Sequence, residues 1–252
     1  MEKRLKTVVV MPAYNAEKTL KMTLDAIPPG SADEIILVDD ASRDNTADLA
    51  RSLGLKVVQH VKNLGYGGNQ KTCYRTALED GADIVVMLHP DYQYNPKLVP
   101  YLAGLIREDI SDIVMANRIR TRREAIQGGM PLYKYICNRG LTLFENLFLG
   151  LNLSEYHTGY RAFSRKALEM IDWEKNSDDF VFDQQILIQA AALGLRIGEI
   201  PVPALYFEEA SSINFWRSLK YGIETLANVG RFVLHRLHIR RYPEYLPKRG
   251  NK

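Results

Sequence analysis

Two hydrophobic periodicities alternate along the first 115 residues, and this alternation constrains the fold more than any other feature of the chain. Short apolar runs rich in β-branched residues lie at residues 7–11, 34–38, 56–58, 84–88 and 113–115. Stretches with apolar residues at helical spacing lie between them, at residues 17–26, 45–53, 69–79 and 96–107. Nearly continuous apolar strands that alternate with helices predict an α/β fold, with a mostly parallel sheet covered by helices on both faces.

The second half of the chain has longer helical stretches and fewer strands. The segment "ANRIRTRREAIQGG" is basic, ends in two glycines and is interpreted as a loop. Long helices are predicted at residues 130–153, 178–194 and 211–241. Ser211 or Ser212 can cap the last of these helices.

Two extended segments separate these helices. The first, "YHTGYRAFSR", is interpreted as a short strand, and Ser164 is expected to cap the helix that follows it. The second, "RIGEIPVPALYF", contains Pro201 and Pro203, which favour a strand at the edge of the sheet.

The chain shows no internal repeat, low-complexity tract or clear linker. We therefore expect one domain over residues 1–210, with a C-terminal amphipathic basic helix and tail over residues 211–252 that pack on the same domain. The two cysteines, Cys73 and Cys137, are too far apart to suggest a disulfide framework and indicate a reducing compartment. The N-terminal apolar run is too short for a signal peptide, and no segment reaches the roughly 18 apolar residues of a membrane span. These features predict a cytoplasmic protein.

Positive charge is concentrated at the C-terminus. Residues 215–252 carry nine basic and two acidic side chains, whereas the remainder of the chain is net acidic. A basic amphipathic helix can lie on a membrane surface against anionic lipid, here the inner face of the cell membrane. Packing on the core or on a partner subunit is the alternative, so an oligomer stays open. Nucleic-acid binding is not expected, because the aromatic residues are spaced as in a packed helix face.

Polar clusters follow three of the predicted strands, namely "PAYN", "DDASRDNT" and "HPDYQY". In a parallel sheet the carboxyl ends of the strands share an edge, and ligands bind there. Asp39 and Asp40 can accept hydrogen bonds from a base or a ribose, or one of them can hold the following turn. In the first cluster, Tyr14 can stack on a nucleobase, and Asn15 is expected to cap the next helix.

The glycine-rich segment "NLGYGGNQK" invites comparison with a dinucleotide fingerprint. Gln70 stands where the third glycine belongs, the segment follows the third strand instead of the first, and no suitable acid follows about 20 residues later. This excludes an NAD site. Glycines such as Gly68 can instead let the backbone approach a phosphate or a sugar.

These motifs occur in a familiar order. The segments "VVVMPAYNAEKTL", "EIILVDDASRDNT", "NLGYGGN" and "HPDYQY" together resemble the family 2 glycosyltransferases, above all the branch similar to dolichyl-phosphate mannose synthase, over about residues 5–210. The resemblance implies a GT-A fold, which is Rossmann-like, and a nucleoside diphosphate sugar donor. It implies a base pocket formed by Asp39, Pro12 and Tyr14. Asp40, Gly68 and Gln93, which matches an Asp-x-Gln pattern, complete the expected donor site.

One position departs from the family pattern. Such enzymes usually carry Asp-x-Asp after the fourth strand, whereas this chain has His89-Pro90-Asp91. A diphosphate with Mn²⁺ or Mg²⁺ needs hard oxygen ligands, so Asp91 is the expected metal ligand and catalytic carboxylate. His89 is a weak Mn²⁺ ligand, a phosphate contact or only the end of the strand.

The acceptor is expected to meet the second half of the chain. The segment "HTGYRAFSR" resembles a family segment near the sugar and acceptor, which makes His157, Thr158 and Arg161 candidates. Arg161 can also be a structural ion-pair residue. In the basic segment before it, Arg118 is the candidate for phosphate contact. Its neighbours Arg120, Arg122 and Arg123 are expected to be solvated.

A transfer to a hydroxyl needs a general base, whereas a phosphate acceptor is already anionic. Asp183 is the candidate base, and an acid that interacts with the helix dipole is the alternative. The sequence thus predicts an inverting glycosyltransferase that transfers a sugar to a polyprenyl phosphate or another membrane-associated acceptor. A soluble glycan acceptor and a non-catalytic sugar-nucleotide-binding protein are alternatives. A nucleotidyltransferase is disfavoured, because no glycine-rich basic loop follows the first strand.

Overall fold

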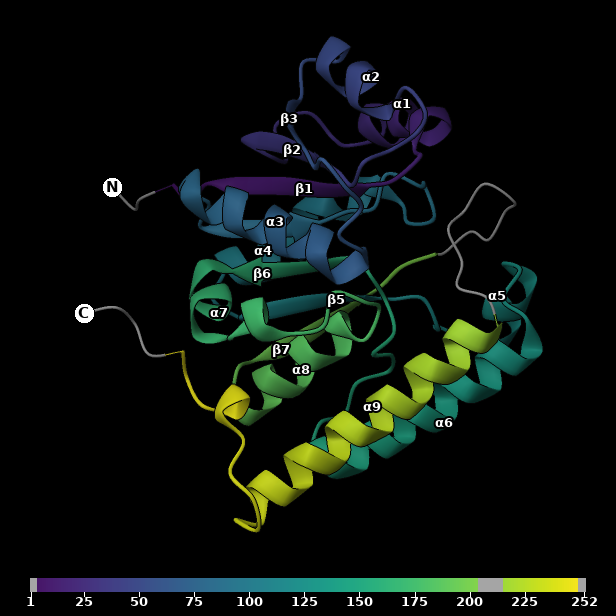
Figure 1. Cartoon of the computed structure of the whole chain (residues 1–252). Coiled ribbons are helices and arrows are strands. Elements are labelled where there is room, and N and C mark those ends of the chain that lie inside the picture. Colours follow the sequence, from purple (N-terminus) through teal and green to yellow (C-terminus); the bar gives the residue numbers. More distant parts are fainter. Residues whose placement is uncertain (1–3, 204–214, 249–252) are drawn as a thin grey trace.

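A seven-stranded sheet is the framework of the computed structural model, which describes residues 4–203 and 215–248 (Figure 1). The strand order is β3-β2-β1-β4-β6-β5-β7. The strands are β1 (Thr7–Ala13), β2 (Glu34–Asp39), β3 (Lys56–Gln59), β4 (Ile84–Met87), β5 (Ile113–Asn117), β6 (Arg161–Ser164) and β7 (Ile197–Pro201). β6 is antiparallel to β4 and β5, and the other neighbours are parallel. The predicted α/β fold with a mostly parallel sheet is confirmed.

Both faces of the sheet are buried, as the apolar strands require. Alternate side chains of β1 enter different cores: Val8 and Val10 pack in one, Val9 and Met11 in the other. The helices α1 (Glu17–Asp25), α2 (Thr46–Ser52) and α4 (Val99–Arg107) contribute to the second core. The helices α3 (Tyr66–Glu79), α7 (Arg165–Met170) and α8 (Phe182–Ala192) contribute to the first. A short 3₁₀ turn, Pro96–Leu98, leads into α4.

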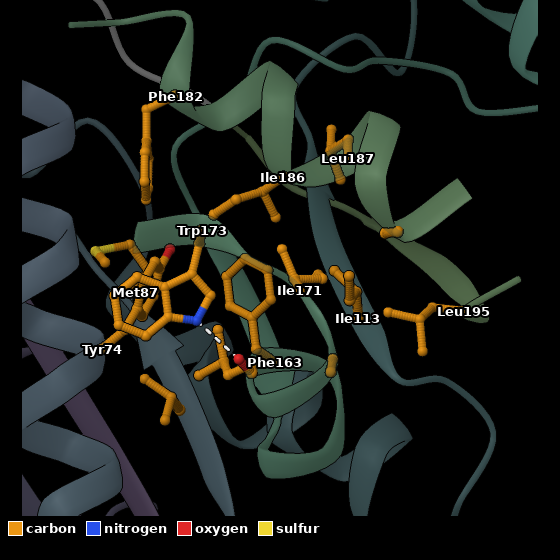
Figure 2. Close-up of a cluster of buried hydrophobic side chains, with 14 of the residues drawn as sticks. Tyr74, Met87, Ile113, Phe163, Ile171, Trp173, Phe182, Ile186, Leu187 and Leu195 are labelled. Atoms are coloured by element: carbon orange, nitrogen blue, oxygen red, sulfur yellow. Dashed lines mark hydrogen bonds between the residues drawn. The ribbon is translucent and has the colours of Figure 1, made fainter. Parts of the chain in front are cut away.

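Trp173 anchors the connection between α7 and α8. It begins the 3₁₀ turn Trp173–Lys175 and is 2% exposed. Its indole nitrogen donates to the carbonyl oxygen of Leu168 at 2.7 Å, and its ring meets Tyr74 edge to face (Figure 2). This buried contact fixes the start of the segment that leads to Asp183.

Two long helices, α6 (Leu132–Leu149) and α9 (Phe215–Arg236), run side by side away from the sheet (Figure 1). The two helices run in the same direction. Gly222, near the start of α9, lies beside Leu141 of α6, since a Cβ added to it would be 3.9 Å from that side chain. Arg236, at the end of α9, lies beside Gly150 at the end of α6, where an added Cβ would be 3.6 Å from the guanidinium. α9 also packs on α8, and the 3₁₀ turn Pro243–Tyr245 follows it. None of the helices in the described part of the chain is both long and apolar enough to span a bilayer.

The structure differs from the sequence-based expectation at the basic segment. This segment is not entirely a loop, because it contains the short helix α5 (Arg122–Gln127). The side chain of Thr121 accepts from the backbone N–H of Glu124 and caps this helix, a signal that the density of arginines obscured.

Other local expectations hold. Ser164 caps α7 by accepting from the N–H of Ala167, and β7 is the edge strand. The expected caps Ser211 and Ser212 lie outside the described residues.

Candidate active site

The carboxyl ends of β2, β1 and β4 are neighbours at one edge of the sheet. Ala13 at the end of β1 pairs with Asp39 at the end of β2, and Val10 pairs with Met87 at the end of β4. The parallel register therefore brings the three polar clusters to the same edge, as the strand pattern predicts. The hydroxyl of Thr19 on α1 donates to the carbonyl oxygen of Pro90 at 2.5 Å and ties the third cluster to the first.

Asp39 presents a buried carboxylate oxygen that is free to accept a hydrogen bond. The residue is 0% exposed, and its Oδ2 accepts from the N–H of Ser42 at 3.2 Å. Its Oδ1 has no hydrogen-bond partner within the described residues. A buried acceptor without a donor costs free energy, so this atom suits a ligand that supplies an N–H or O–H group.

Asp40 has the opposite surroundings. Its Oδ1 accepts from the N–H of Leu64 at 2.8 Å, and its Oδ2 accepts from that of Gly65 at 3.1 Å. The ring of His60 approaches Oδ1 at 2.8 Å. Asp40 therefore holds the loop before α3, which is the turn-holding role that the sequence left open for one of the two acids.

Two further members of the predicted base pocket lie in the first cluster. Pro12 is buried within β1, and Tyr14, just beyond the strand, is 49% exposed. The expected helix cap at Asn15 is wrong. Asn15 has a φ of 53°, and its side-chain oxygen accepts from the N–H of Arg43, while the N–H of Glu17 donates to Asp44.

The glycines before and within α3 allow a close approach between two backbone segments. The N–H of Gly67 donates to the carbonyl oxygen of Asp178 at 2.8 Å. A Cβ on Gly67 would lie 2.4 Å from the carbonyl oxygen of Ser177, and one on Gly65, where φ is 87°, would lie 2.7 Å from that of Asp178. This packing gives a structural reason for the motif, and the phosphate contact expected at Gly68 stays a prediction.

His89 packs deep in the site against Tyr66. The two rings are parallel, with centroids 5.5 Å apart, and His89 Nε2 lies 3.4 Å from the Tyr66 hydroxyl. Burial lowers the pKa of His89, although the Asp91 and Asp183 carboxylates oppose it. This shift favours the neutral imidazole, the form that a metal ligand requires. Asp91 Oδ1 accepts from the N–H of Gln93 at 3.1 Å, which orients this carboxylate.

Asp183 lies in the first turn of α8 and reaches the same cluster. The hydroxyl of Tyr66 donates to its Oδ2 at 2.7 Å, and the side-chain amide of Gln70 donates to its Oδ1 at 3.0 Å. Burial, followed by the Asp183 charge, raises the pKa of Tyr66 well above its usual value, so the phenol remains a donor. The candidate base and the His89 segment thus meet through one tyrosine.

Tyr66 and Gln70 are site residues that sequence reasoning missed. They lie four residues apart on α3 and therefore on one helix face. The expected helix began at Asn69, which hid this relationship. A helix expected to start at Tyr66 would have placed Tyr66 and Gln70 on one face, and this four-residue spacing is the signal that the sequence offered.

The side chain of Arg161 is engaged inside the protein. It is 1% exposed, and its guanidinium donates to the carbonyl oxygens of Tyr156, Thr158 and Asp183 at 2.7–2.9 Å. It also lies 3.6 Å from the Asp183 carboxylate. These contacts match the structural ion-pair role that the sequence left open.

Arg118 reaches the acceptor-side segment from the end of β5. It pairs with the fully buried Glu155 and donates to the carbonyl oxygen of His157. Burial opposes ionisation of Glu155, but Arg118 outweighs it and lowers the pKa of Glu155. The next two residues of the segment bind Tyr94, with the Thr158 hydroxyl at 3.4 Å and the Gly159 N–H at 3.1 Å from its oxygen. The structure therefore joins the sequence candidates Arg118, His157 and Thr158 in one packed segment.

The other arginines of the basic segment face solvent. Arg120, just before α5, pairs with Glu124 in its first turn at 3.0 Å, and both side chains are exposed. Arg122 and Arg123 are exposed at the start of α5. This agrees with the expectation that these three side chains are solvated.

Comparison with known proteins defines the class. Residues 8–171 match Glycosyl transferase family 2. The chain is 31% identical over 217 residues to the UDP-N-acetylglucosamine–dolichyl-phosphate N-acetylglucosaminyltransferase of Methanococcus voltae, covering 79% of this chain and 86% of that protein. It is 29% identical over 212 residues to the undecaprenyl-phosphate mannosyltransferase of Micrococcus luteus, covering 79% and 83%.

Solved structures agree on the fold. Glucosyl-3-phosphoglycerate synthase from Mycobacterium tuberculosis, in complex with Mn²⁺, UDP and glucosyl-3-phosphoglycerate, superposes with a TM-score of 0.70 at 22% identity, covering 91% of this chain and 80% of that one. The fold is thus GT-A. The chain belongs to glycosyl transferase family 2 and is a glycosyltransferase.

Proposed function

We propose that this enzyme transfers a sugar, with inversion, from a nucleoside diphosphate sugar to a polyprenyl phosphate. Binding of the nucleoside diphosphate sugar is supported above all by Asp39, whose buried Oδ1 has no partner within the described residues. Asp39 lies at the same edge of the sheet as Asp91. The acceptor half is supported by the two relatives named for dolichyl-phosphate and undecaprenyl-phosphate transfer. We take residues 1–210 as the catalytic domain and residues 211–252 as a helix and tail that pack on it.

In the donor site, Asp39 accepts a hydrogen bond from the base, beside Pro12 and Tyr14. Gly68 and Gln93 lie nearer the sugar and phosphates. Asp40 contributes indirectly through the loop that it holds.

Divalent-metal binding is consistent with the donor atoms at His89 and Asp91. No cluster of three or more His, Cys, Asp or Glu side chains suited to a metal occurs in the described residues. A cation with one carboxylate and one neutral imidazole from the protein must take its other ligands from diphosphate oxygens and water, which is common for Mg²⁺ and acceptable for Mn²⁺. Such a cation would neutralise charge on the leaving nucleoside diphosphate.

On the acceptor side, the segment from Glu155 to Thr158 with Arg118 lies beside the donor cluster. Asp183 serves as general base where the acceptor is a hydroxyl, and a phosphate acceptor needs none. Arg161 orients the Asp183 backbone from within the protein.

A peripheral membrane contact through α6 and α9 would bring the enzyme to a lipid-linked acceptor. Large apolar side chains are exposed along both helices: Leu132, Ile136, Leu143, Leu147, Trp216, Leu219 and Ile223. Basic side chains at the end of α9 complement anionic headgroups. We accordingly place the enzyme at the inner face of the cell membrane.

The test is a transfer assay with the purified protein. UDP-, GDP- and dTDP-sugars are combined with undecaprenyl or dolichyl phosphate, with Mn²⁺, Mg²⁺ or EDTA present. We expect a lipid-linked sugar and released nucleoside diphosphate from one donor, and loss of both with EDTA. Transfer only to soluble glycans would replace the acceptor assignment, and nucleotide binding without any nucleoside diphosphate release would favour a binding protein.

A further inference from the structure

Four buried or partly buried side chains from distant parts of the chain form a ring of close polar contacts beside the acceptor segment. His157 Nδ1 lies 2.8 Å from the hydroxyl of Tyr221, which donates to Gln184 Oε1 at 3.4 Å. Gln184 Nε2 donates to Glu145 Oε1, and Glu145 Oε2 lies 3.3 Å from His157 Nε2. The members come from α6, α8, α9 and the segment before β6.

A proton between Glu145 and His157 would complete the ring. Glu145 Oε2 and His157 Nε2 lie 3.3 Å apart, and neither atom has a hydrogen-bond partner within the described residues. As carboxylate and lone pair, both atoms would be buried acceptors facing each other, which is unfavourable. A proton on Glu145 Oε2 makes it a donor to His157 Nε2. His157 Nδ1–H then donates to Tyr221, whose own O–H points to Gln184, and every group has one partner.

The surroundings favour this neutral form. Glu145 is 0% exposed, and burial raises the pKa of its carboxyl well above the usual value, although Arg161 opposes this. Burial lowers the pKa of His157 to about 4, although the charge of Glu155 opposes it. Both shifts favour the uncharged forms of the two groups.

The ring lies next to the catalytic cluster through three consecutive residues. His157 is followed by Thr158 and then Gly159, whose Cα faces His89: a Cβ there would lie 2.7 Å from His89 Nε2 and 3.2 Å from the Tyr66 hydroxyl. A shift of the His157 backbone would therefore also move Gly159 relative to His89.

We propose that Glu145, His157, Gln184 and Tyr221 are positioning residues, which hold the segment 157–159 against His89 and thereby couple the α6–α9 pair to sugar transfer. This inference rests on the proposed function. It adds Glu145, Gln184 and Tyr221, which no motif of the sequence indicates, and it makes the packing of α9 a condition for an efficient transfer step.

The test compares two tyrosines whose hydroxyls join α9 to other parts of the chain: Tyr221, which lies on α9, and Tyr245, which lies in the turn after it. Tyr221→Phe removes one link of the ring, whereas Tyr245→Phe removes a hydrogen bond to the Asn228 carbonyl at the far part of the same helix. We expect Tyr221→Phe to lower kcat for transfer to polyprenyl phosphate by about tenfold or more, with affinities for UDP and GDP within about twofold of wild type. Tyr245→Phe should lose thermal stability to a similar extent and keep its kcat. Equal kcat values for the two variants would overturn the proposal, and so would a parallel loss of nucleotide affinity in Tyr221→Phe.

Glu145 gives an independent test that survives if Tyr221→Phe folds poorly. Glutamine at this position reproduces a neutral acid, since it can donate to His157 and accept from Gln184. We expect Glu145→Gln to recover most of the rate that Glu145→Leu loses. A Glu145→Gln variant as slow as Glu145→Leu would require an ionised carboxylate and would overturn the neutral ring.

A spectroscopic readout separates the ring from the proposed function. In ¹⁵N-histidine-labelled protein at pH 7, His157 should show the neutral Nδ1–H tautomer, and Tyr221→Phe should perturb that signal. A charged His157 or the other tautomer would contradict the ring, even if transfer is confirmed. Absence of any transfer by the wild type, with the expected tautomer present, would instead count against the proposed function alone.

Discussion

The hydroxyl of Tyr66 donates to Oδ2 of Asp183 at 2.7 Å, although the two residues are 117 positions apart in the sequence. Gln70 donates to the other oxygen of the same carboxylate. Each oxygen retains a lone pair, so Asp183 can still accept a proton from an acceptor hydroxyl. The fixed orientation is what a general base needs, and it is equally suited to a structural acid.

Asp183→Asn distinguishes these roles by the class of acceptor. With a hydroxyl acceptor, loss of a base should lower kcat by about 100-fold or more, with nucleotide affinity unchanged. With polyprenyl phosphate, no base is required, and kcat should fall less than about tenfold because only positioning is disturbed. Steady-state kinetics with both acceptors measure this difference. A large loss of melting temperature with little kinetic effect would show that the carboxylate is structural.

Asp39→Asn and Asp40→Asn are a matched pair of adjacent substitutions. Asparagine at position 39 replaces one carboxylate oxygen with an NH₂ group. Since Oδ1 has no partner within the described residues, the lost hydrogen bond affects nucleotide binding and not folding. We expect nucleotide affinity to fall by about 10- to 100-fold with little change in stability, since a hydrogen bond to a charged group contributes about 1.5–3 kcal/mol. Isothermal titration with UDP and GDP measures the affinity.

Asp40→Asn should behave in the reverse way. The substitution places an amide where the carboxylate accepts from two backbone N–H groups. A loss of about 1–2 kcal/mol corresponds to about 3–6 °C in melting temperature for a domain of this size. Both effects in the same variant, or neither, would contradict the separate roles of these two acids.

Much of this arrangement follows from the sequence, and the remainder depends on contacts between distant residues. Apolar runs bounded by polar clusters predicted β1, β2 and β4 and the shared edge with Asp39 and Asp91, because strand pairing in parallel sheets is set by local pattern and connection. The partners of Arg118 and Arg161 could not be predicted in this way. Their partners are a buried glutamate and backbone carbonyls from other segments, and no local motif marks them.

The same limit applies to the glycines and to the Glu145 ring. "GYGG" indicates a close approach, but only the structure identifies the approaching group as the 177–178 backbone and not a phosphate. Glu145 stands in an apolar helix, where a lone acid gives no sign of its partners. The polar residues that sequence reasoning missed are those whose partners lie on other elements.

Gly159→Ala tests the close contact between the acceptor segment and His89. The new methyl group would lie 2.7 Å from His89 Nε2, so the ring or the segment must move. We expect a drop in kcat of about tenfold or more and a weaker dependence on Mn²⁺, because a 1 Å displacement in a site is costly. Gly104→Ala is the control, since a Cβ there meets nothing within 4 Å inside α4 and should be neutral or stabilising. Wild-type kinetics in Gly159→Ala would show that His89 is not held by this contact.

Asp112 predicts how stability depends on acidity. Arg196, the main cause, lowers the pKa of Asp112 to about 2, against an ordinary value of 3.8. Because the unfolded chain binds this proton first, stability is fully present above about pH 4 and is lost as the pH falls toward 2. The full effect approaches about 2 kcal/mol, and urea unfolding between pH 5 and pH 3 measures about half of it. Asp112→Asn should be less stable than the wild type at pH 5, and its free energy of unfolding should depend less on pH. Asp109→Asn, which changes an 89% exposed carboxylate paired with the same arginine, should retain the wild-type slope.

The exposed apolar side chains of α6 and α9 lead to the final prediction, which concerns membrane binding. Leu143 and Leu147 lie one turn apart on α6 and are 71% and 72% exposed, and Ile223 on α9 is 60% exposed. Burying each side chain in a bilayer interface is favourable by about 1.5–3 kcal/mol, so Leu143→Glu with Leu147→Glu should reduce binding to anionic vesicles by more than about 100-fold. Co-sedimentation with vesicles of phosphatidylglycerol and phosphatidylcholine measures the binding.

The control for this experiment is Tyr101→Glu, an exposed aromatic position on α4, away from the helix pair. That variant should bind vesicles as the wild type does. The double variant should keep its kcat with a detergent-solubilised acceptor, since neither leucine contacts the ring or the strand-end cluster. A wild-type protein that does not bind vesicles but forms a dimer that the double variant disrupts would assign the apolar face to a second copy of the chain. That outcome would contradict the membrane proposal and leave the donor site unaffected, because the donor site depends on β1, β2 and β4.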